Sequence, residues 1–234
     1  MTSERAGDPG LGVVSERIVA IDGPSGSGKS TVARGVAQRL GLEVLDTGAM
    51  YRALTLLVLE RGIDPADSVA CTRAARELVL EVGARTILDG RDVSDAIRGP
   101  EVTAAVSTVS AHPGVREVLV GRQRAWVASH GGGVVEGRDI GTVVFPDARV
   151  KVFLTASEGE RARRRQRDEH AADRVVEVDS VHADLLRRDD LDSKREVSPL
   201  KVSADALVLD TTDRQVEAVV GEIVERFESS GRTR

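Results

Sequence analysis

Residues 17–30 read RIVAIDGPSGSGKS, a short apolar run followed by a glycine-rich turn. The run at 17–22 has the length and apolar character of a strand, and the segment 31–40 has helical spacing before Gly41. Between them, residues 23–30 match G-x-x-x-x-G-K-[ST] in the strand–loop–helix context that this motif requires. The stretch therefore predicts a loop that binds the phosphates of a nucleoside triphosphate.

The residue types of this loop suit phosphate binding. Its glycines let successive backbone N–H groups turn inward around phosphate oxygens, and the following helix presents its positive N-terminus to them. Lys29 is expected to reach the β- and γ-phosphates, and Ser30 to place its hydroxyl on Mg²⁺. The residues expected to bind the triphosphate are Gly23, Pro24, Ser25, Gly26, Ser27, Gly28, Lys29, Ser30 and Thr31.

Composition bounds the class of protein. The chain has 234 residues, 41% hydrophobic and 30% charged, as in a soluble globular protein of one large domain or two small ones. No window approaches the roughly 18 apolar residues of a membrane helix, and residues 1–16 lack the apolar stretch of a signal peptide. The net charge of −5 argues against bulk nucleic-acid binding, and the lone Cys71 favours a reducing compartment. We expect a cytoplasmic monomer without nucleic-acid or membrane partners.

Short apolar runs alternate with helical segments along the chain. Besides the run at 17–22, strands are expected at 42–46, 132–139, 149–156 and 205–211. Because parallel neighbours need crossover helices, this alternation predicts an α/β fold with a doubly wound parallel sheet.

One segment departs from the alternation. Residues 69–98 contain a helical stretch and then short strand-like runs separated by turns, which predicts a small antiparallel subdomain inserted into the fold. We expect one domain over residues 17–229, with flexible tails at 1–16 and 230–234.

A nucleoside triphosphate site is compatible with a GTPase, an ATPase motor or a small-molecule kinase. The N-K-x-D element that selects guanine in GTPases is impossible here because the chain contains no asparagine. A motor usually needs more chain for its coupling elements. A small kinase fits the length best, and it requires a second set of residues that bind the phosphate acceptor.

Four sequence blocks are arranged in a specific order, namely IDGPSGSGKS at 21–30, LDTGAMYR at 45–52, EGRDIGTVVFP at 136–146 and RDDLDSKR at 188–195. In order and spacing they resemble the signature blocks of bacterial cytidylate kinases, a family of P-loop nucleoside monophosphate kinases. The resemblance implies ATP-dependent phosphorylation of CMP and dCMP by direct in-line transfer, assisted by Mg²⁺ and without a covalent intermediate. It also implies that segment 69–98 binds the monophosphate and that residues 158–176 form a mobile lid.

The acceptor site must overcome charge repulsion, because a monophosphate with nearly two negative charges meets an ATP with about four. Arginine suits this task, being permanently charged and bidentate. By the resemblance, Arg52, Arg138 and Arg195 hold the acceptor phosphate. Of three arginines on the lid helix we favour Arg161 and Arg165 over Arg164, because residues four apart share one helix face.

The resemblance also assigns recognition of the nucleoside. Ser107, Arg116 and Asp139, with Thr47 nearby, are expected to read the cytosine, and Asp192 with Arg188 the ribose hydroxyls. Asp139 can accept a hydrogen bond from the amino group of cytosine, and Arg116 can donate to N3 or O2. The set expected to act in catalysis is Lys29, Arg138, Arg161, Arg165 and Arg188.

Three questions stay open at this point. Glu136 either orients Mg²⁺-bound water or is simply an acidic residue that ends a strand. An enzyme of the same superfamily with another acceptor, such as UMP, shikimate or gluconate, would keep the phosphate loop but lose the cytosine and ribose sets. A regulatory protein would hold ATP without turning it over.

Overall fold

The computed structural model describes residues 14–171 and 178–230. The predicted tails at 1–16 and 230–234 and the predicted lid at 158–176 therefore lie partly outside the described residues. Within them, Val14 packs against the core and the backbone of Ser15 accepts a hydrogen bond from Arg149. The ordered fold thus begins slightly before the first strand.

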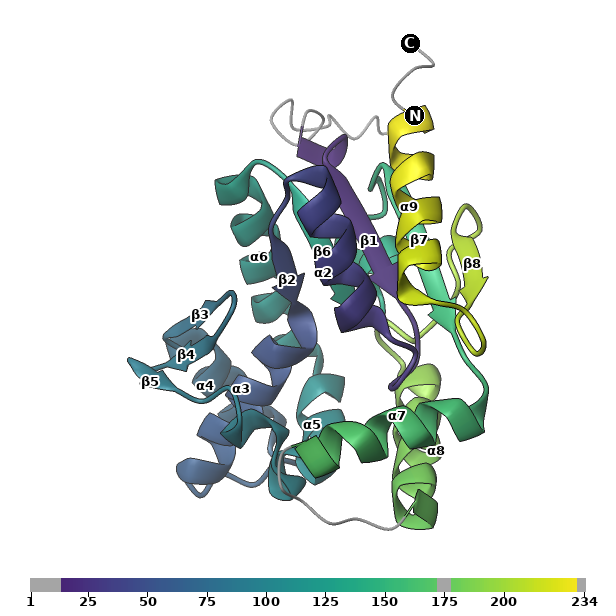
Figure 1. Ribbon diagram of the computed structural model, residues 1–234. Coiled ribbons are helices and arrows are strands. Elements are labelled where there is room, and N and C mark those ends of the chain that lie inside the picture. Colours follow the sequence, from purple (N-terminus) through teal and green to yellow (C-terminus); the bar gives the residue numbers. More distant parts are fainter. Residues whose placement is uncertain (1–13, 172–177, 231–234) are drawn as a thin grey trace, which may run out of the picture.

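The centre of the molecule is a five-stranded sheet with the order β2-β6-β1-β7-β8 (Figure 1). Every neighbouring pair is parallel. The strands are β1 (Ile18–Asp22), β2 (Val44–Asp46), β6 (Gly133–Gly137), β7 (Val150–Thr155) and β8 (Leu207–Asp210). The prediction of a doubly wound parallel sheet is confirmed.

Helices cover both faces of the sheet, and each face has its own hydrophobic core. Successive side chains of β1 enter these two cores alternately. Val19 and Ile21 pack with α2 (Lys29–Leu40) and α9 (Val216–Ser230), which lie side by side on one face (Figure 1). Ile18 and Ala20 belong to the other core. That core is built with α3 (Thr47–Glu60), α5 (Pro100–Ala111) and α6 (Pro113–His130). A strand buried on both faces explains why its sequence is apolar without alternation.

The segment between α3 and α5 forms a small structure of its own. Helix α4 (Ser68–Glu77) is followed by β3 (Leu80–Val82), β4 (Thr86–Leu88) and β5 (Arg91–Asp92), and then by the 3-10 helix η1 (Ala96–Arg98). The three strands make an antiparallel sheet separate from the central one. The antiparallel excursion expected at 69–98 is present, and its role in binding a monophosphate stays a prediction.

Two helices lie beyond the carboxyl ends of the central strands (Figure 1). Helix α7 (Glu158–Ala171) packs against α8 (Val178–Lys194). A short π-helical turn, η2 (Ile140–Val144), follows β6 directly. In the part of the chain that the structure describes, no helix combines the length and apolar character needed to cross a membrane.

We predict that Ile21→Ala lowers the free energy of unfolding by about 2–5 kcal/mol, because Ile21 is completely buried in β1 and its loss leaves a cavity. The measurement is urea denaturation followed by circular dichroism. Val69→Ala is the control, since Val69 lies 81% exposed on α4 and its replacement should change the free energy by less than about 0.5 kcal/mol. Equal effects of both substitutions would contradict the described core.

Candidate active site

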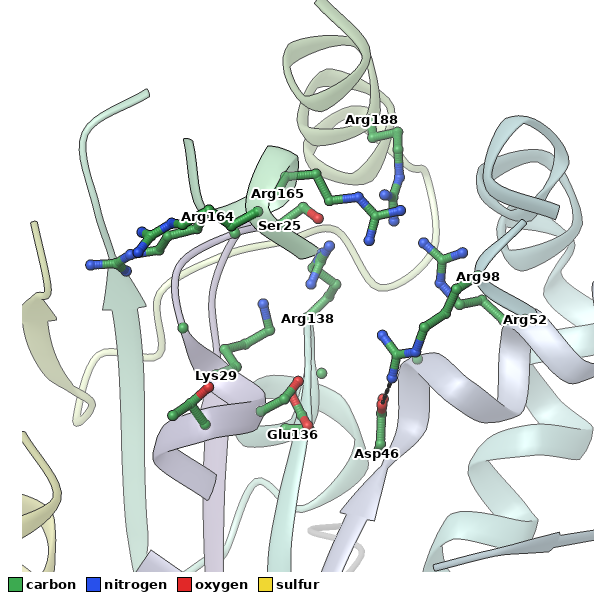
Figure 2. Close-up of a pocket in the computed structure, with 17 residues that line it drawn as sticks. Ser25, Lys29, Asp46, Arg52, Arg98, Glu136, Arg138, Arg164, Arg165 and Arg188 are labelled. Carbon is green, nitrogen blue, oxygen red and sulfur yellow. Dashed lines mark hydrogen bonds and ion pairs between the residues drawn. The ribbon is translucent and has the colours of Figure 1, made fainter. Parts of the chain in front are cut away.

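A cavity of about 390 Å³ opens at the carboxyl ends of β1, β2 and β6, between the glycine-rich loop and helices α7 and α8 (Figure 2). Two of its charged side chains are acidic, Asp46 and Glu136. The others are basic, namely Lys29, Arg52, Arg98, Arg138, Arg164, Arg165, Arg167 and Arg188. The cavity therefore suits a highly charged anion.

The loop at 23–30 leaves no room for side chains at its tightest points. A Cβ on Gly23, whose φ is +149°, would lie 2.1 Å from the carbonyl oxygen of Leu154 in β7. A Cβ on Gly26 would lie 2.8 Å from the carbonyl oxygen of Arg161 in α7. Glycine is needed at both positions because the loop is packed between a strand and a helix.

Lys29 points its ammonium group into this loop, where Nζ donates to the carbonyl oxygen of Pro24 at 2.7 Å. Burial lowers the pKa of Lys29, and the positive charge of Arg138 lowers it further. A bound anion would therefore stabilise the charged form of Lys29.

Ser30 and Glu136 bring two hard oxygen donors together beside the loop. The Ser30 hydroxyl donates to Oε2 of Glu136 at 2.9 Å. Burial raises the pKa of Glu136, and the nearby carboxylate of Asp46 raises it further. Among the described residues no cluster of three or more His, Cys, Asp or Glu side chains could hold a metal. A hydroxyl and one or two carboxylates fit Mg²⁺, which usually takes its other ligands from phosphate and water.

A second, smaller hollow of about 80 Å³ adjoins the first, and Gly48, Arg52, Gly137, Arg138 and Arg188 line both. All residues predicted to bind the acceptor line this second hollow, namely Thr47, Arg52, Ser107, Arg116, Arg138, Asp139, Arg188, Asp192 and Arg195. They come from α3, α5, α6, α8 and the segments after β6 and α8. The tertiary structure brings these dispersed positions together, while their individual roles stay predictions.

Arg116 and Asp139 form a buried ion pair in the second hollow. The Arg116 guanidinium also lies over the ring of Tyr51, 5.3 Å from its centroid. Thr47 is held nearby, because its hydroxyl donates to the carbonyl oxygen of Glu136 at 2.8 Å. The pair is thus fixed in position before any ligand binds.

Arg138 connects the two hollows. Its Nε donates to Oδ2 of Asp192 at 2.9 Å, and its Nη1 donates to the carbonyl oxygen of Gly23 in the phosphate loop at 3.1 Å. Burial opposes the charge of Asp192, but Arg138 and Arg195 outweigh it and hold the pKa of Asp192 below its usual range. Asp192 is therefore a fixed negative charge that orients the arginines around it.

The arginines of α7 divide into two groups. Arg164, Arg165 and Arg167 line the large cavity, and Figure 2 shows Arg165 pointing into it while the guanidinium of Arg164 points to the side, away from Lys29 and Arg138. Arg161 lies against the phosphate loop, where it donates to the carbonyl oxygen of Ser25 at 3.2 Å and pairs with Asp189. The other oxygen of Asp189 accepts the N–H of Ser25 at 3.2 Å. Arg161 and Arg165 are one helical turn apart on α7, but Arg161 contacts the loop whereas Arg165 lines the cavity.

Sequence reasoning ranked Arg164 below Arg161 and Arg165, and it assigned no role to Arg98 or Asp46. Arg164 donates to the hydroxyl and carbonyl oxygens of Thr211 at 2.8 and 2.7 Å while lining the cavity. Arg98 lies 3.7 Å from Asp46 across the cavity mouth (Figure 2). Asp46 ends β2 within the block LDTGAMYR, which could have marked it. Nothing in the local sequence pattern marks Arg98.

A parallel sheet with a phosphate loop and a cation-lined cavity at its carboxyl edge defines a P-loop kinase. The family model for cytidylate kinase matches residues 19–229, and the chain belongs to this family. Its similarity to individual members extends over nearly its whole length.

The chain is 54% identical to the cytidylate kinase of Mycolicibacterium paratuberculosis over 211 residues, which cover 88% of this chain and 92% of that protein. It is 53% identical to the cytidylate kinase of Corynebacterium glutamicum over 218 residues, 91% of this chain and 95% of that protein. The cytidylate kinase of Mycobacterium leprae is 51% identical over 213 residues, 91% of this chain and 96% of that protein.

We predict that ATP binding takes up protons at about pH 8, because the lowered pKa leaves Lys29 partly neutral in the free protein and a polyanion favours its charged form. The measurement is isothermal titration calorimetry in two buffers of different ionisation enthalpy. The uptake should be smaller at about pH 6, where the lysine already carries its proton. A binding enthalpy independent of the buffer at the higher pH would contradict this prediction.

Proposed function

We propose that this chain transfers the γ-phosphoryl group of ATP to the phosphate of CMP or dCMP, forming ADP and CDP or dCDP. One observation carries the proposal. The cavity that contains the phosphate loop adjoins the hollow lined by all the predicted acceptor residues, and Arg52, Arg138 and Arg188 belong to both. Two anionic substrates bound there would meet with cations between them.

The chemistry needs positioning rather than a general base. The second pKa of a phosphate monoester is about 6, so the acceptor oxygen is already a nucleophile at neutral pH. A phosphate oxygen of CMP attacks the γ-phosphorus of ATP in line, and the bond from that phosphorus to the β,γ-bridging oxygen breaks. The electron pair leaves with ADP. No bond to the protein forms in this proposal.

Catalysis then depends on neutralising the charge that both phosphates carry. Arg138 is held by Asp192 and by the carbonyl oxygen of Gly23, so its guanidinium stays between the two hollows. Arg52 is anchored through Nη1 to the carbonyl oxygen of Ile97 and the hydroxyl of Thr103, each at 3.0 Å. Preorganised cations of this kind need little reorganisation when charge develops.

The remaining predicted cations have separate tasks. Lys29 and Arg165 contact the phosphates from the loop and from α7, and Arg188 does so from α8. Arg161 donates to the carbonyl oxygen of Ser25 and pairs with Asp189, which accepts the N–H of Ser25, so the two side chains together fix this part of the loop. Arg195 supports the acceptor phosphate from beside Asp192, 3.9 Å from its carboxylate.

Mg²⁺, when bound, neutralises part of the charge on the β- and γ-phosphates. The Ser30 hydroxyl would hold it, with Glu136 holding its coordinated water. The 2.9 Å contact between these two side chains supports this assignment.

Nucleoside recognition falls to the smaller hollow. Asp139 accepts a hydrogen bond from the cytosine amino group, Arg116 donates to N3 or O2, and Ser107 and Thr47 complete the base site. Asp192 with Arg188 reads the ribose hydroxyls. The buried ion pair of Arg116 with Asp139 supports a site that selects by hydrogen bonding, because an unsuitable base would leave these groups unpaired.

We also propose that the enzyme acts in the cytoplasm as a monomer, without nucleic-acid or membrane partners. A single chain lines both hollows, which supports a site complete in one copy. The lid at 158–176 and the inserted segment at 69–98 are proposed to close over the substrates.

A coupled assay of ADP formation tests the function directly. The acceptors CMP, dCMP, UMP, AMP and shikimate are compared at saturating ATP. We expect the highest kcat/KM with CMP and dCMP. A preference for another acceptor would identify a different kinase of the superfamily, and no turnover with any of them would indicate a regulatory ATP-binding protein.

We predict that Asp139→Asn narrows the ratio of kcat/KM for CMP over UMP by about tenfold or more, mainly by losing CMP activity. The amide both donates and accepts, so it no longer disfavours the O4 of uracil. Steady-state kinetics with both acceptors measures the ratio. If both activities fall together and the ratio stays constant, Asp139 holds Arg116 in place and does not read the base.

A further inference from the structure

Asp22 is a buried carboxylate that the proposed mechanism does not use. It ends β1, directly before the phosphate loop, and is only 4% exposed. Its Oδ1 accepts the N–H of Ile140 and its Oδ2 the N–H of Gly141, both at 2.8 Å. Burying a carboxylate is costly unless its oxygens are hydrogen-bonded, and here two consecutive backbone groups supply the bonds.

These two N–H groups belong to the start of η2, the short helical turn that follows Asp139. The first N–H groups of a helix have no partner within it, and an Asp at the preceding position usually accepts them with its own side chain. Asp139 occupies that position but makes no such hydrogen bond. Its carboxylate is paired with Arg116 instead.

Elsewhere the same chain uses the ordinary arrangement. Asp46 caps α3 by accepting the N–H of Ala49 at 3.0 Å. Asp67 caps α4 with one oxygen, which accepts the N–H groups of Val69 and Ala70 at 3.0 and 2.9 Å. At η2 the capping is instead performed by Asp22, a residue more than a hundred positions away that lies on the adjacent strand.

We propose that Asp22 is a positioning residue for base recognition. By capping η2 it leaves the Asp139 carboxylate available to pair with Arg116 and to read the base. The inference rests on the proposed function, in which Asp139 selects cytosine. Because Asp22 also precedes Gly23, it connects the turn that carries Arg138 and Asp139 to the start of the phosphate loop.

Without the Asp22 carboxylate, the start of η2 would need another acceptor for its N–H groups. The N–H groups of Ile140 and Gly141 would lose hydrogen-bond acceptors in a buried site, and the side chain of Asp139, in the usual capping position, can accept the N–H of Gly141 at the second helical position. A rotated Asp139 would cap its own helical turn and leave Arg116. The enzyme would then lose discrimination between bases although Asp139 is still present.

The test compares Asp22→Asn, which preserves volume but leaves one acceptor oxygen for the two N–H groups, and Asp22→Ser, which keeps one small acceptor, with the wild type. We expect kcat/KM for CMP to fall by about tenfold or more, UMP activity to fall less, and the KM for ATP to stay within about twofold. The ratio of kcat/KM for the two acceptors is independent of the fraction of folded enzyme, so a less stable variant is still informative. An unchanged ratio in both variants, or no active protein from either, would place Asp22 in the scaffold alone and overturn the proposal.

Asp67→Asn is the matched control. It perturbs a carboxylate that also accepts two consecutive N–H groups at a helix start, but Asp67 is exposed and lines neither hollow. We expect it to lower thermal stability and to leave the CMP over UMP ratio unchanged. A narrowed ratio in this variant would show that any weakened cap affects selectivity, and would overturn a specific role for Asp22.

A double variant establishes whether Asp22 acts through Asp139. If it does, Asp22→Asn combined with Asp139→Asn has the same CMP over UMP ratio as Asp139→Asn alone. Independent, multiplying effects on the ratio would contradict the proposal. Failure of the proposed function is recognised separately, because a wild-type enzyme without a preference for CMP would refute it before any variant is compared.

Discussion

Repulsion among the arginines that line the active-site cavity is the constraint on which the rest of the site depends. Burial and then the charges of Arg188, Arg165 and Arg98 hold the pKa of Arg52 well below its usual value, and burial and Arg138 lower that of Arg188 to about 10. Carboxylates offset part of this repulsion, since Asp192 pairs with Arg138 and the charge of Asp189 favours the charged forms of Arg138 and Arg188. The polyanionic substrates would relieve the remainder, so the repulsion among the arginines favours substrate binding.

The parallel sheet makes this crowding possible. The register of β1 with β6 places Asp22 opposite Gly137, so the residues that follow both strands emerge at one edge. The phosphate loop follows β1 and leads into helix α2. Arg138 and Asp139 follow β6 and lead into η2. Helices α7 and α8 add arginines from beyond that edge. Most of the contacts that hold the site together therefore join residues far apart in the chain.

The differences between the sequence-based expectations and the structure follow from this geometry. Helical periodicity places Arg161 and Arg165 one turn apart on α7. It carries no information about which of these residues contacts the phosphate loop and which lines the cavity. Arg161 forms hydrogen bonds with Ser25 of the loop and with Asp189. Arg164 lines the cavity and donates a hydrogen bond to Thr211. Helix α8 ends at Lys194, which is paired with Asp190 one turn earlier.

The sequence by itself determined the glycine-rich loop between a strand and a helix, the parallel α/β fold and the inserted antiparallel segment, and it predicted a set of acceptor residues. Local backbone chemistry or the order of signature blocks specifies each of these. Only the tertiary structure decided that the acceptor residues share one hollow, that Arg138 spans both hollows, and that Asp22 caps the turn after Asp139. Hydrogen bonds between strands depend on strand order and register, which arise from packing two hydrophobic cores against the sheet and which no local pattern encodes.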